Sequence, residues 1–229
     1  MVAPPPLSEM PSGAPLGSDG PCPEQPFGSL TLPMALSASL RLTPEQFERL
    51  CLANPDAVLE LAADGSLIPM TPTGSETSGR NSSLLIALGQ AVQASGLPLK
   101  LFDSSGGFRL PDDSVRSPDA SLVLMERWRA LSAAQRRSFA PLCPDLVIEL
   151  ASPSDEGPRG LTALRQKMAA YQRNGARLGW LLIPEERAVE MWGPLEGGEQ
   201  GRRIEPATRL EGAPEFPGLT LDLEPIWAE

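Results

Sequence analysis

The order of apolar and polar positions predicts a central strand at residues 145–151, with the sequence DLVIELA. Successive side chains of a strand point to opposite faces of the sheet. One face of this segment carries Leu146, Ile148 and Leu150, and the other carries Val147, Glu149 and Ala151. Because both faces are mostly apolar, we expect the strand to lie inside a sheet, which places Glu149 on a largely buried surface.

Helices are predicted where apolar residues recur at helical spacing behind a capping signal. The segment Thr43-Pro44-Glu45-Gln46 combines a capping threonine, a proline at the first helical position and a glutamine that completes a capping box. We therefore expect a helix to about Asn54. Further helices are expected between Ser75 and Gly96, from Ser132 to about Phe139, and over residues 161–174.

The remaining apolar runs predict strands that alternate with these helices. They are LEL (59–61), SLIPM (66–70), LKLF (99–102), GFRL (107–110), SPDASLVL (117–124), LGWLLI (178–183), AVEMW (188–192) and FPGLTLDL near the C-terminus. A strand–helix–strand crossover is expected over residues 145–183. This mixture predicts an α/β or α+β fold in which helices flank a mixed sheet.

Composition divides the chain into two parts. Residues 1–40 contain nine of the 26 prolines and neither lysine nor arginine. Such a segment buries too little apolar surface to offset the entropy lost on ordering. We therefore expect a disordered tail at residues 1–40 and one folded domain at residues 41–229, which is long enough to bury a substantial core.

The formal net charge of −10 and the absence of histidine narrow the chemistry. The charge argues against a broadly basic surface for nucleic acid, although it is compatible with a local basic groove. Without histidine the chain cannot form a Ser-His-Asp triad, a Cys-His pair or a His-ligated zinc site. The scattered cysteines Cys22, Cys51 and Cys143 predict reduced thiols in a cytoplasmic protein. No apolar run is long enough to span a membrane.

Three residues are candidates for chemistry, and each also has an ordinary structural interpretation. A buried carboxylate such as Glu149 is unfavourable unless it is paired, metal-bound or protonated, or unless the strand end lets it reach solvent. Asp119 follows Pro118, and Pro-Asp is a common turn. Lys167 flanks the apolar stripe of helix 161–174, as would a lysine whose stem only covers apolar surface.

Together the three residues indicate a more specific arrangement. Two carboxylates would lie on strands of one sheet, and the lysine would lie on the crossover helix. Carboxylate oxygens suit a hard cation such as Mg²⁺ or Mn²⁺, which lowers the pKa of a bound water and polarises a phosphoryl oxygen. A nearby lysine offsets the charge that develops in the transition state. The pattern therefore indicates phosphoryl transfer that needs no histidine.

Several stretches of the sequence, in the right order, resemble the Uma family of cyanobacteria and other bacteria. They are TPTGSETSGRN (71–81), LFDSSGGFRLPDDSVRSPDASLV (101–123), PLCPDLVIELASPSD (141–155) and KMAAYQRNGARLGWLLIP (167–184). The resemblance runs from about Leu40 to the C-terminus. It implies a restriction-endonuclease-like fold of the PD-(D/E)XK nuclease superfamily.

The resemblance also implies roles for individual residues. Pro118-Asp119 matches the PD element and Glu149 the second acid. The superfamily lysine usually lies two residues after that acid, where this chain has Ala151, and Lys167 on the next helix matches its displaced position. Tyr171 matches a recurrent position on the same helix.

Two further implications concern the metal. Asp119 and Glu149, with the backbone carbonyl of Leu150, would hold Mg²⁺ or Mn²⁺. Glu76 matches an accessory acid only in the branch of the family that carries G-x-E-T, and the histidine that many relatives have nearby is missing here.

Three functions remain open at this point. The first is a metal-dependent nuclease that acts on DNA or RNA, with a homodimer as one arrangement for cutting two strands. The second is a catalytically idle module with a nuclease fold, which binds nucleic acid or a protein partner. The third is a structural helper of a mobile element or a toxin system, for which the sequence offers no test.

Overall fold

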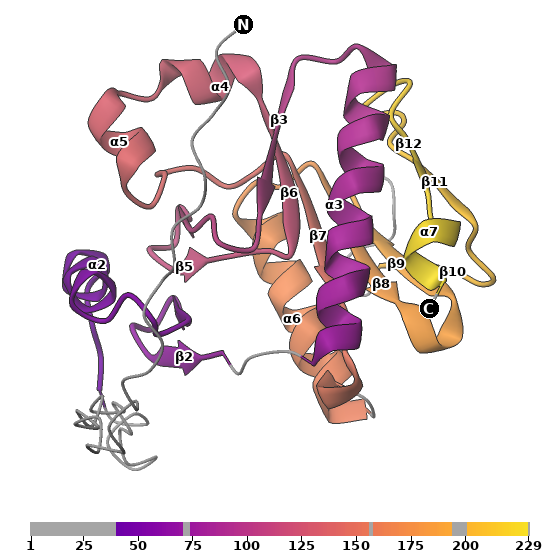
Figure 1. Cartoon of the computed structure of the whole chain (residues 1–229). Coiled ribbons are helices and arrows are strands. Elements are labelled where there is room, and N and C mark those ends of the chain that lie inside the picture. Colours follow the sequence, from indigo (N-terminus) through magenta and orange to yellow (C-terminus); the bar gives the residue numbers. More distant parts are fainter. Residues whose placement is uncertain (1–39, 71–73, 156–157, 194–200, 229) are drawn as a thin grey trace, which may run out of the picture.

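The computed structural model describes residues 40–70, 74–155, 158–193 and 201–228 (Figure 1). The predicted disordered tail at residues 1–40 therefore lies, apart from Leu40, outside the described residues, as does Cys22. The described part contains two sheets and a separate C-terminal hairpin. None of its helices is both long enough and apolar enough to cross a membrane.

The larger sheet has six strands in the order β10-β9-β8-β7-β6-β3. Strands β7 and β8 run parallel and are joined by helix α6, whereas every other neighbouring pair is antiparallel. The bounds are β3 (Leu99–Asp103), β6 (Ala120–Leu124), β7 (Leu146–Leu150), α6 (Pro158–Arg173), β8 (Leu178–Ile183), β9 (Ala188–Trp192) and β10 (Arg202–Ile204). The predicted crossover and the central position of residues 145–151 are confirmed.

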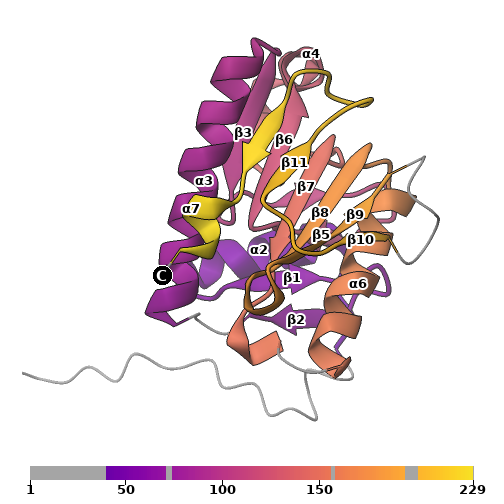
Figure 2. The ribbon, with the colours of Figure 1, turned by 90° about the vertical axis from the view of Figure 1, so that its right-hand side faces the viewer.

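Helices cover both faces of this sheet (Figures 1 and 2). Leu146, Ile148 and Leu150 of β7 face a core shared with helix α3 and the C-terminal elements. Val147 and Ala151 face a second core that includes Met168 and Tyr171 of α6. The elements that cover the first of these two faces are α3 (Ser75–Ser95), β11 (Arg209–Glu211), β12 (Thr220–Asp222) and α7 (Glu224–Trp227). The alternation read from the sequence therefore assigns both faces of β7, and Glu149 points toward α6.

The smaller sheet has four short strands in the order β2-β1-β5-β4. Helix α2 packs on it, and together they bury a small apolar cluster around Phe47, Leu61 and Val115. The bounds are α2 (Pro44–Ala53), β1 (Leu59–Leu61), β2 (Leu67–Pro69), β4 (Phe108–Arg109) and β5 (Val115–Arg116). Because β5 leads through Ser117 to Asp119 directly into β6, the small sheet is joined to the edge of the site described below.

Local signals place several elements where they were expected. Thr43 and Gln46 form both hydrogen bonds of a capping box before α2. Gly96 ends α3 in the left-handed conformation, with a φ of 66°. Ser132 caps α5 (Ala133–Arg137) with a second capping box, although this helix is shorter than predicted. Three further short elements are α4 (Met125–Ala130), η1 (Pro153–Asp155) and η2 (Pro184–Glu186). The sequence patterns did not predict the short helices α4 and α7.

The two strands expected around the Ser-Ser-Gly-Gly turn are present, but they belong to different sheets. All five residues of β3 pair with β6, whereas β4 pairs with β5. The contact between them is made by side chains, since the rings of Phe102 and Phe108 meet edge-to-face with centroids 5.3 Å apart. A turn signal specifies a reversal of the chain, but it does not specify which edge accepts the second strand.

Candidate active site

Asp119 and Glu149 face each other across strands β6 and β7. The register pairs Ala120 with Ile148, so Asp119 stands beside Glu149 one residue beyond the last registered pair. Asp119 Oδ2 accepts a hydrogen bond of 2.8 Å from the N–H of Leu150. Because the N–H and C=O of a strand residue point to the same side, the carbonyl of Leu150 also faces the side of Asp119. The Glu149 residue is only 3% exposed.

Helix α6 brings Lys167 to the same place. The Nζ atom of Lys167 lies 2.9 Å from Glu149 Oε1, and Lys167 also donates a hydrogen bond of 3.4 Å to the carbonyl of Ser117. The helix crosses back over the sheet after β7, so Lys167 points to the sheet and not to solvent. The structure therefore brings Asp119, Glu149 and Lys167 together.

Tyr171 lies one helical turn after Lys167 and completes the surroundings of Glu149. Its hydroxyl donates a hydrogen bond of 3.1 Å to Glu149 Oε1, the same oxygen that contacts Lys167. The Lys167 amine lies 6.0 Å from the centroid of the Tyr171 ring. This is the only tyrosine in the chain. One oxygen of Glu149 is thus held by two donors from α6.

A second glutamate, Glu60 of β1, contacts the same amine and was not identified from the sequence. Glu60 Oε1 lies 2.9 Å from Lys167 Nζ and accepts a hydrogen bond of 2.9 Å from the N–H of Ser117. Its other oxygen accepts one of 2.9 Å from Arg116. In the sequence, Glu60 alternates with Leu59 and Leu61, which would place it on the solvent side of an isolated hairpin. Only the pairing of β1 with β5 reveals its true environment.

The carboxyl groups of the site respond differently to burial. Burial raises the pKa of Glu149 to about 8, and the charges of Asp119 and Glu60 act in the same direction, against the opposing effect of Lys167. Burial also raises the pKa of Asp119, with further contributions from Glu60 and Asp155. Glu60 behaves in the opposite way, because Lys167, Arg116 and the Ser117 N–H outweigh its burial and lower its pKa.

Lys167 remains charged in this environment. Burial by itself would lower the pKa of its amine, but the nearby carboxylates of Glu149 and Glu60 outweigh that effect and raise it. The pKa of the Tyr171 phenol is well above its usual range because the group is buried beside Glu149. The site therefore contains Lys167 and Arg116 beside three acids, and two of these acids have a raised pKa.

Glu76 is not drawn into this group. It lies in the first turn of α3 with about half of its side chain exposed, and it pairs with Arg80 at 2.7 Å. The same arginine contacts Glu185 of η2 at 2.9 Å. Within the described part of the chain, no hydrogen bond or ion pair joins Glu76 to Asp119, Glu149 or Lys167. The expected accessory acid is therefore engaged by a partner four residues later on its own helix.

The donor set can be tested against a divalent cation. Among the described residues, no group of three or more His, Cys, Asp or Glu side chains is arranged to hold a metal ion. Mg²⁺, however, is typically bound by one or two carboxylates and keeps several waters. Within the described chain, Oδ1 of Asp119 and Oε2 of Glu149 make no hydrogen bond or ion pair. These two oxygens and the adjacent Leu150 carbonyl fit such a partly hydrated cation.

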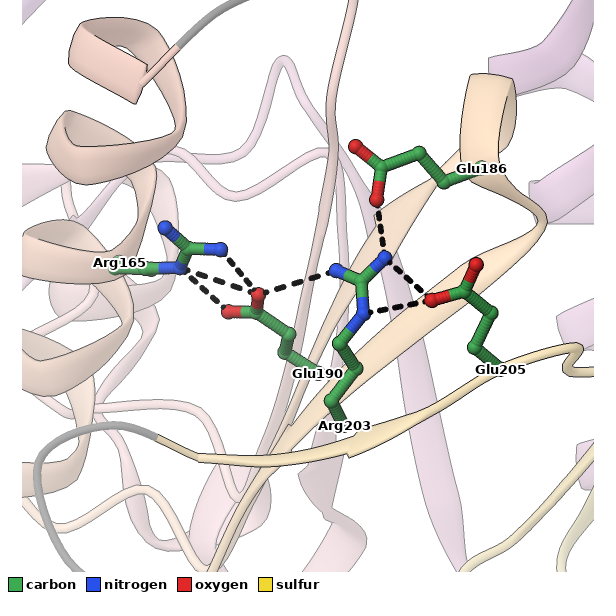
Figure 3. A network of polar contacts seen from close by, with 5 residues as sticks. All are labelled: Arg165, Glu186, Glu190, Arg203 and Glu205. Atoms are coloured by element: carbon green, nitrogen blue, oxygen red, sulfur yellow. Dashed lines mark hydrogen bonds and ion pairs between the residues drawn. The ribbon is translucent and has the colours of Figure 1, made fainter.

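A different buried glutamate lies on the other flank of α6 (Figure 3). Glu190 of β9 is 4% exposed and is gripped by the guanidinium of Arg165, with contacts of 2.8 and 3.1 Å from Nε. Arg203 of β10 approaches the same carboxylate at 3.6 Å and also contacts Glu186 and Glu205. A groove of about 610 Å³ lies beside this network. It is separate from the Asp119 and Glu149 pair.

Comparison with known proteins identifies the family. The sequence from residue 44 to residue 224 matches the family Uma2, described as "Putative restriction endonuclease". The chain belongs to the Uma2 family. The match spans most of the chain and includes every residue of the site. The family relationship read from the sequence motifs is therefore confirmed.

The fold of this Uma2 chain also resembles a solved structure. That structure is described as "a putative nuclease belonging to DUF820" from Anabaena variabilis ATCC 29413. The TM-score is 0.63 at 19% sequence identity, and the similarity covers 81% of this chain and 97% of that one. The restriction-endonuclease-like α/β fold is thus confirmed. A comparison with curated proteins finds no match.

Proposed function

We propose that this Uma2 protein hydrolyses phosphodiester bonds of nucleic acid with the help of Mg²⁺ or Mn²⁺. The observation that carries the proposal is the position of the Lys167 amine. Its Nζ atom lies 2.9 Å from Glu149 Oε1, and Glu149 is on β7, the strand that pairs with β6 beside Asp119. Lys167, on the helix after β7, thus lies close to the two acids that the resemblance to the family matches with its site. Membership of a family described as putative restriction endonucleases supports the same reaction class.

Asp119, Glu149 and the Leu150 carbonyl would hold the metal ion. When bound, such an ion lowers the pKa of a water and offsets charge on a phosphoryl oxygen. Burial raises the pKa of both carboxyl groups in the metal-free chain, and a divalent cation beside them would favour their ionised forms. Glu76, which is engaged by Arg80, is not part of this ligand set.

The protein's own groups have separate tasks. Lys167 is a cation whose raised pKa excludes it as a general base near neutral pH, so it orients the attacking water and stabilises charge on the phosphate. Tyr171 donates to Glu149 Oε1 and fixes the orientation of that carboxylate. Asp119 is fixed in the same way by the Leu150 N–H. Both acids are thus held in place before a substrate arrives, which is the arrangement that efficient catalysis requires.

The net charge of −10 bears on the substrate. Nucleic acid approaching an acidic protein is repelled unless cations intervene, so we expect weak binding that is confined to the neighbourhood of the metal. The free thiols Cys51 and Cys143 agree with a reducing compartment, and we propose that the protein acts in the cytoplasm. We also propose a homodimer as one arrangement for cutting two strands.

A cleavage screen tests the proposal. Single- and double-stranded DNA and RNA would be incubated with the protein in Mg²⁺, in Mn²⁺ and in chelator. We expect metal-dependent cleavage of at least one substrate, lost in Asp119→Asn and retained in Glu190→Gln, whose carboxyl group lies outside the site. Unchanged cleavage by Asp119→Asn would refute the assignment.

A catalytically idle binding module is the second candidate. It is favoured by the acidic net charge and by the low content of aromatic residues, which is 5%. Calorimetry with Mn²⁺ separates the two functions, because an idle module releases no heat that depends on Asp119. Binding of nucleic acid without cleavage, together with such a result, would establish the second candidate.

A further inference from the structure

Glu60 approaches the site from the smaller sheet, whereas Asp119, Glu149 and Lys167 belong to the larger sheet and its crossover helix. The residue is 2% exposed and accepts contacts of 2.9 Å from three donors, which are Lys167 Nζ, the Arg116 guanidinium and the Ser117 N–H. A buried carboxylate with this many partners is held in one position.

The lysine side chain needs such a partner. Its four-carbon stem is flexible and its ammonium group is a point charge without a preferred direction. Glu149 contacts the amine from the larger sheet, and the carbonyl of Ser117 contacts it from the segment that leads into β6. Glu60 contacts it from the smaller sheet, also at 2.9 Å. With both glutamates present, the amine is held 2.9 Å from a glutamate oxygen of each sheet.

The anchors of Glu60 also connect it to Asp119. Arg116 and Ser117, which donate to Glu60, immediately precede Pro118 and Asp119 in the chain. The segment that fixes Glu60 is therefore the segment that delivers Asp119 to the site. A displacement of Glu60 would be transmitted both to the lysine and to the entry of β6.

We propose that Glu60 is a positioning residue, which holds the Lys167 amine against Glu149 and thereby makes the smaller sheet part of the reaction centre. The proposal rests on the proposed function only for its effect on cleavage. The placement of the lysine by Glu60 is independent of it. The contacts of Glu60 are with Lys167, Arg116 and Ser117, so its effect on the reaction is exerted through Lys167.

A purely structural role is the alternative, and the chain supplies a matched control. Glu190 is also a buried glutamate in a strand, with cationic partners on α6 and on a neighbouring strand, but it lies outside the site (Figure 3). Glu60→Gln and Glu190→Gln both remove one buried carboxylate. If Glu60 were only structural, the two variants would lose stability in the same way and would cleave equally well.

The composition of the chain makes the placement directly measurable. The chain has two lysines, Lys100 and Lys167, and a single tyrosine, Tyr171. Lys100 lies over the rings of Phe102 and Trp128, far from Glu60 in sequence, and serves as an internal reference. Acylation by an amine-reactive ester, followed by mass spectrometry, would report the ratio of labelling at the two lysines. In protein labelled with ¹³Cζ-tyrosine, the one resonance would report on the Tyr171–Glu149 hydrogen bond.

Three results are expected for Glu60→Gln. Labelling of Lys167 relative to Lys100 increases, and the tyrosine resonance shifts. With the substrate found in the screen, kcat falls about a hundredfold while KM changes little, as for a displaced catalytic group. Glu190→Gln shows none of the three, although its unfolding midpoint falls. Unchanged lysine labelling and an unchanged tyrosine resonance in folded Glu60→Gln would overturn the proposal.

A failure of the proposed function can be distinguished from a failure of the proposed role of Glu60. If Asp119→Asn cleaves as well as the unmodified protein, the reaction assignment fails, while the labelling and the resonance still decide whether Glu60 places the lysine. If Glu60→Gln does not fold, Glu60→Asp replaces it, because aspartate keeps the charge but withdraws the carboxylate by one methylene. A smaller change of the same sign in all three measurements is then expected, and no change in any of them would overturn the proposal.

Discussion

Helix α6 supplies cationic side chains to two groups of buried acids, one around Glu190 and one around Glu149, which differ in their ratio of acids to cations. On one flank, Arg165 grips Glu190 of β9, with Arg203 as a second cation (Figure 3). On the other flank, two residues later, Lys167 contacts Glu149 and Glu60. The first centre provides two guanidinium groups for one buried acid. The second holds three acids, Glu60, Asp119 and Glu149, with Arg116 and Lys167 as its cations.

The difference is informative because a stable fold has no need of the second arrangement. A buried acid is normally compensated by donors, as Glu190 is by Arg165. Glu149 also has donors, Lys167 and Tyr171, yet burial raises its pKa to about 8, so its charged form is disfavoured in the protein alone. A perturbed pKa of this kind is often found at functional sites, where a ligand supplies a further interaction. The comparison therefore supports our proposal that Glu149 has a chemical task, whereas Glu190 has a structural one.

The two cations of α6 provide the largest expected contrast. Lys167→Met removes the charge that faces the phosphate, so we expect cleavage to fall by about a thousandfold. Arg165→Met removes the partner of Glu190 and should change cleavage by less than a few-fold. Initial rates on the substrate from the screen would be compared for both variants. Equal losses would show that the two flanks of the helix are not functionally distinct.

Metal binding should distinguish the two centres almost as clearly. A cation at a concentration of a hundred times its Kd stabilises the fold by about 2.7 kcal/mol when it binds only the folded state. We expect Mn²⁺ to raise the unfolding midpoint of the unmodified protein and of Glu190→Gln, but not that of Asp119→Asn. Thermal unfolding with and without chelator measures this directly. A shift retained in Asp119→Asn would place the metal elsewhere.

Neutralising each glutamate should affect stability with opposite signs. In metal-free protein at pH 7–8, Glu149→Gln removes a carboxyl group that must take up a proton on folding, and it should stabilise the fold by about 1–2 kcal/mol, while abolishing cleavage. Glu190→Gln breaks a satisfied contact and should destabilise it by about 1–3 kcal/mol. Denaturant unfolding would measure both. Destabilisation by Glu149→Gln would contradict the contrast.

The same pair should differ in pH dependence. Because the pKa of Glu149 is raised on folding, the native chain keeps a proton that the unfolded chain releases. Its contribution to stability is therefore complete below about pH 4.5 and is lost as the pH rises toward 8. The slope is at most about 1.4 kcal/mol per pH unit. Relative to the unmodified protein, Glu149→Gln should lose this slope and Glu190→Gln should keep it.

Glu76 should give the smallest effect. Its side chain is half exposed, and its pair with Arg80 is therefore expected to contribute no more than about 0.5 kcal/mol. Glu76→Gln should retain cleavage within a few-fold and bind Mn²⁺ as the unmodified protein does. Calorimetry and initial rates would test both expectations. A loss of metal affinity would return Glu76 to the accessory role that the family pattern implies.

Local sequence signals predict the larger sheet well. The alternation in residues 145–151 gives the faces of β7, and the apolar stripe of α6 places Lys167 at the edge of the buried face. The capping residues Thr43 and Ser132 begin their helices as expected. These features depend on neighbours within a few residues, so periodicity and capping chemistry are sufficient to predict them.

Contacts between segments that are distant in the sequence could not be predicted from local patterns. Glu60 was overlooked because its environment is created by the pairing of β1 with β5, which no local pattern specifies. The separation of β3 and β4 into two sheets has the same origin. Glu76 illustrates the converse, since a family motif indicates an acid at that position but not that Arg80 engages it. Glu190 also looks like an ordinary strand residue until Arg165 is placed beside it.

The contact between Glu60 and Lys167 has a consequence for the order of folding. It joins the first strand of the described chain to the crossover helix, which are far apart in sequence. Contacts with large sequence separation form slowly, because the intervening chain must first lose its freedom. During synthesis, the lysine and the tyrosine follow all three acids out of the ribosome. A growing chain would therefore carry the three acids with Arg116 but without Lys167, and the complete centre would form only after the helix docks onto both sheets.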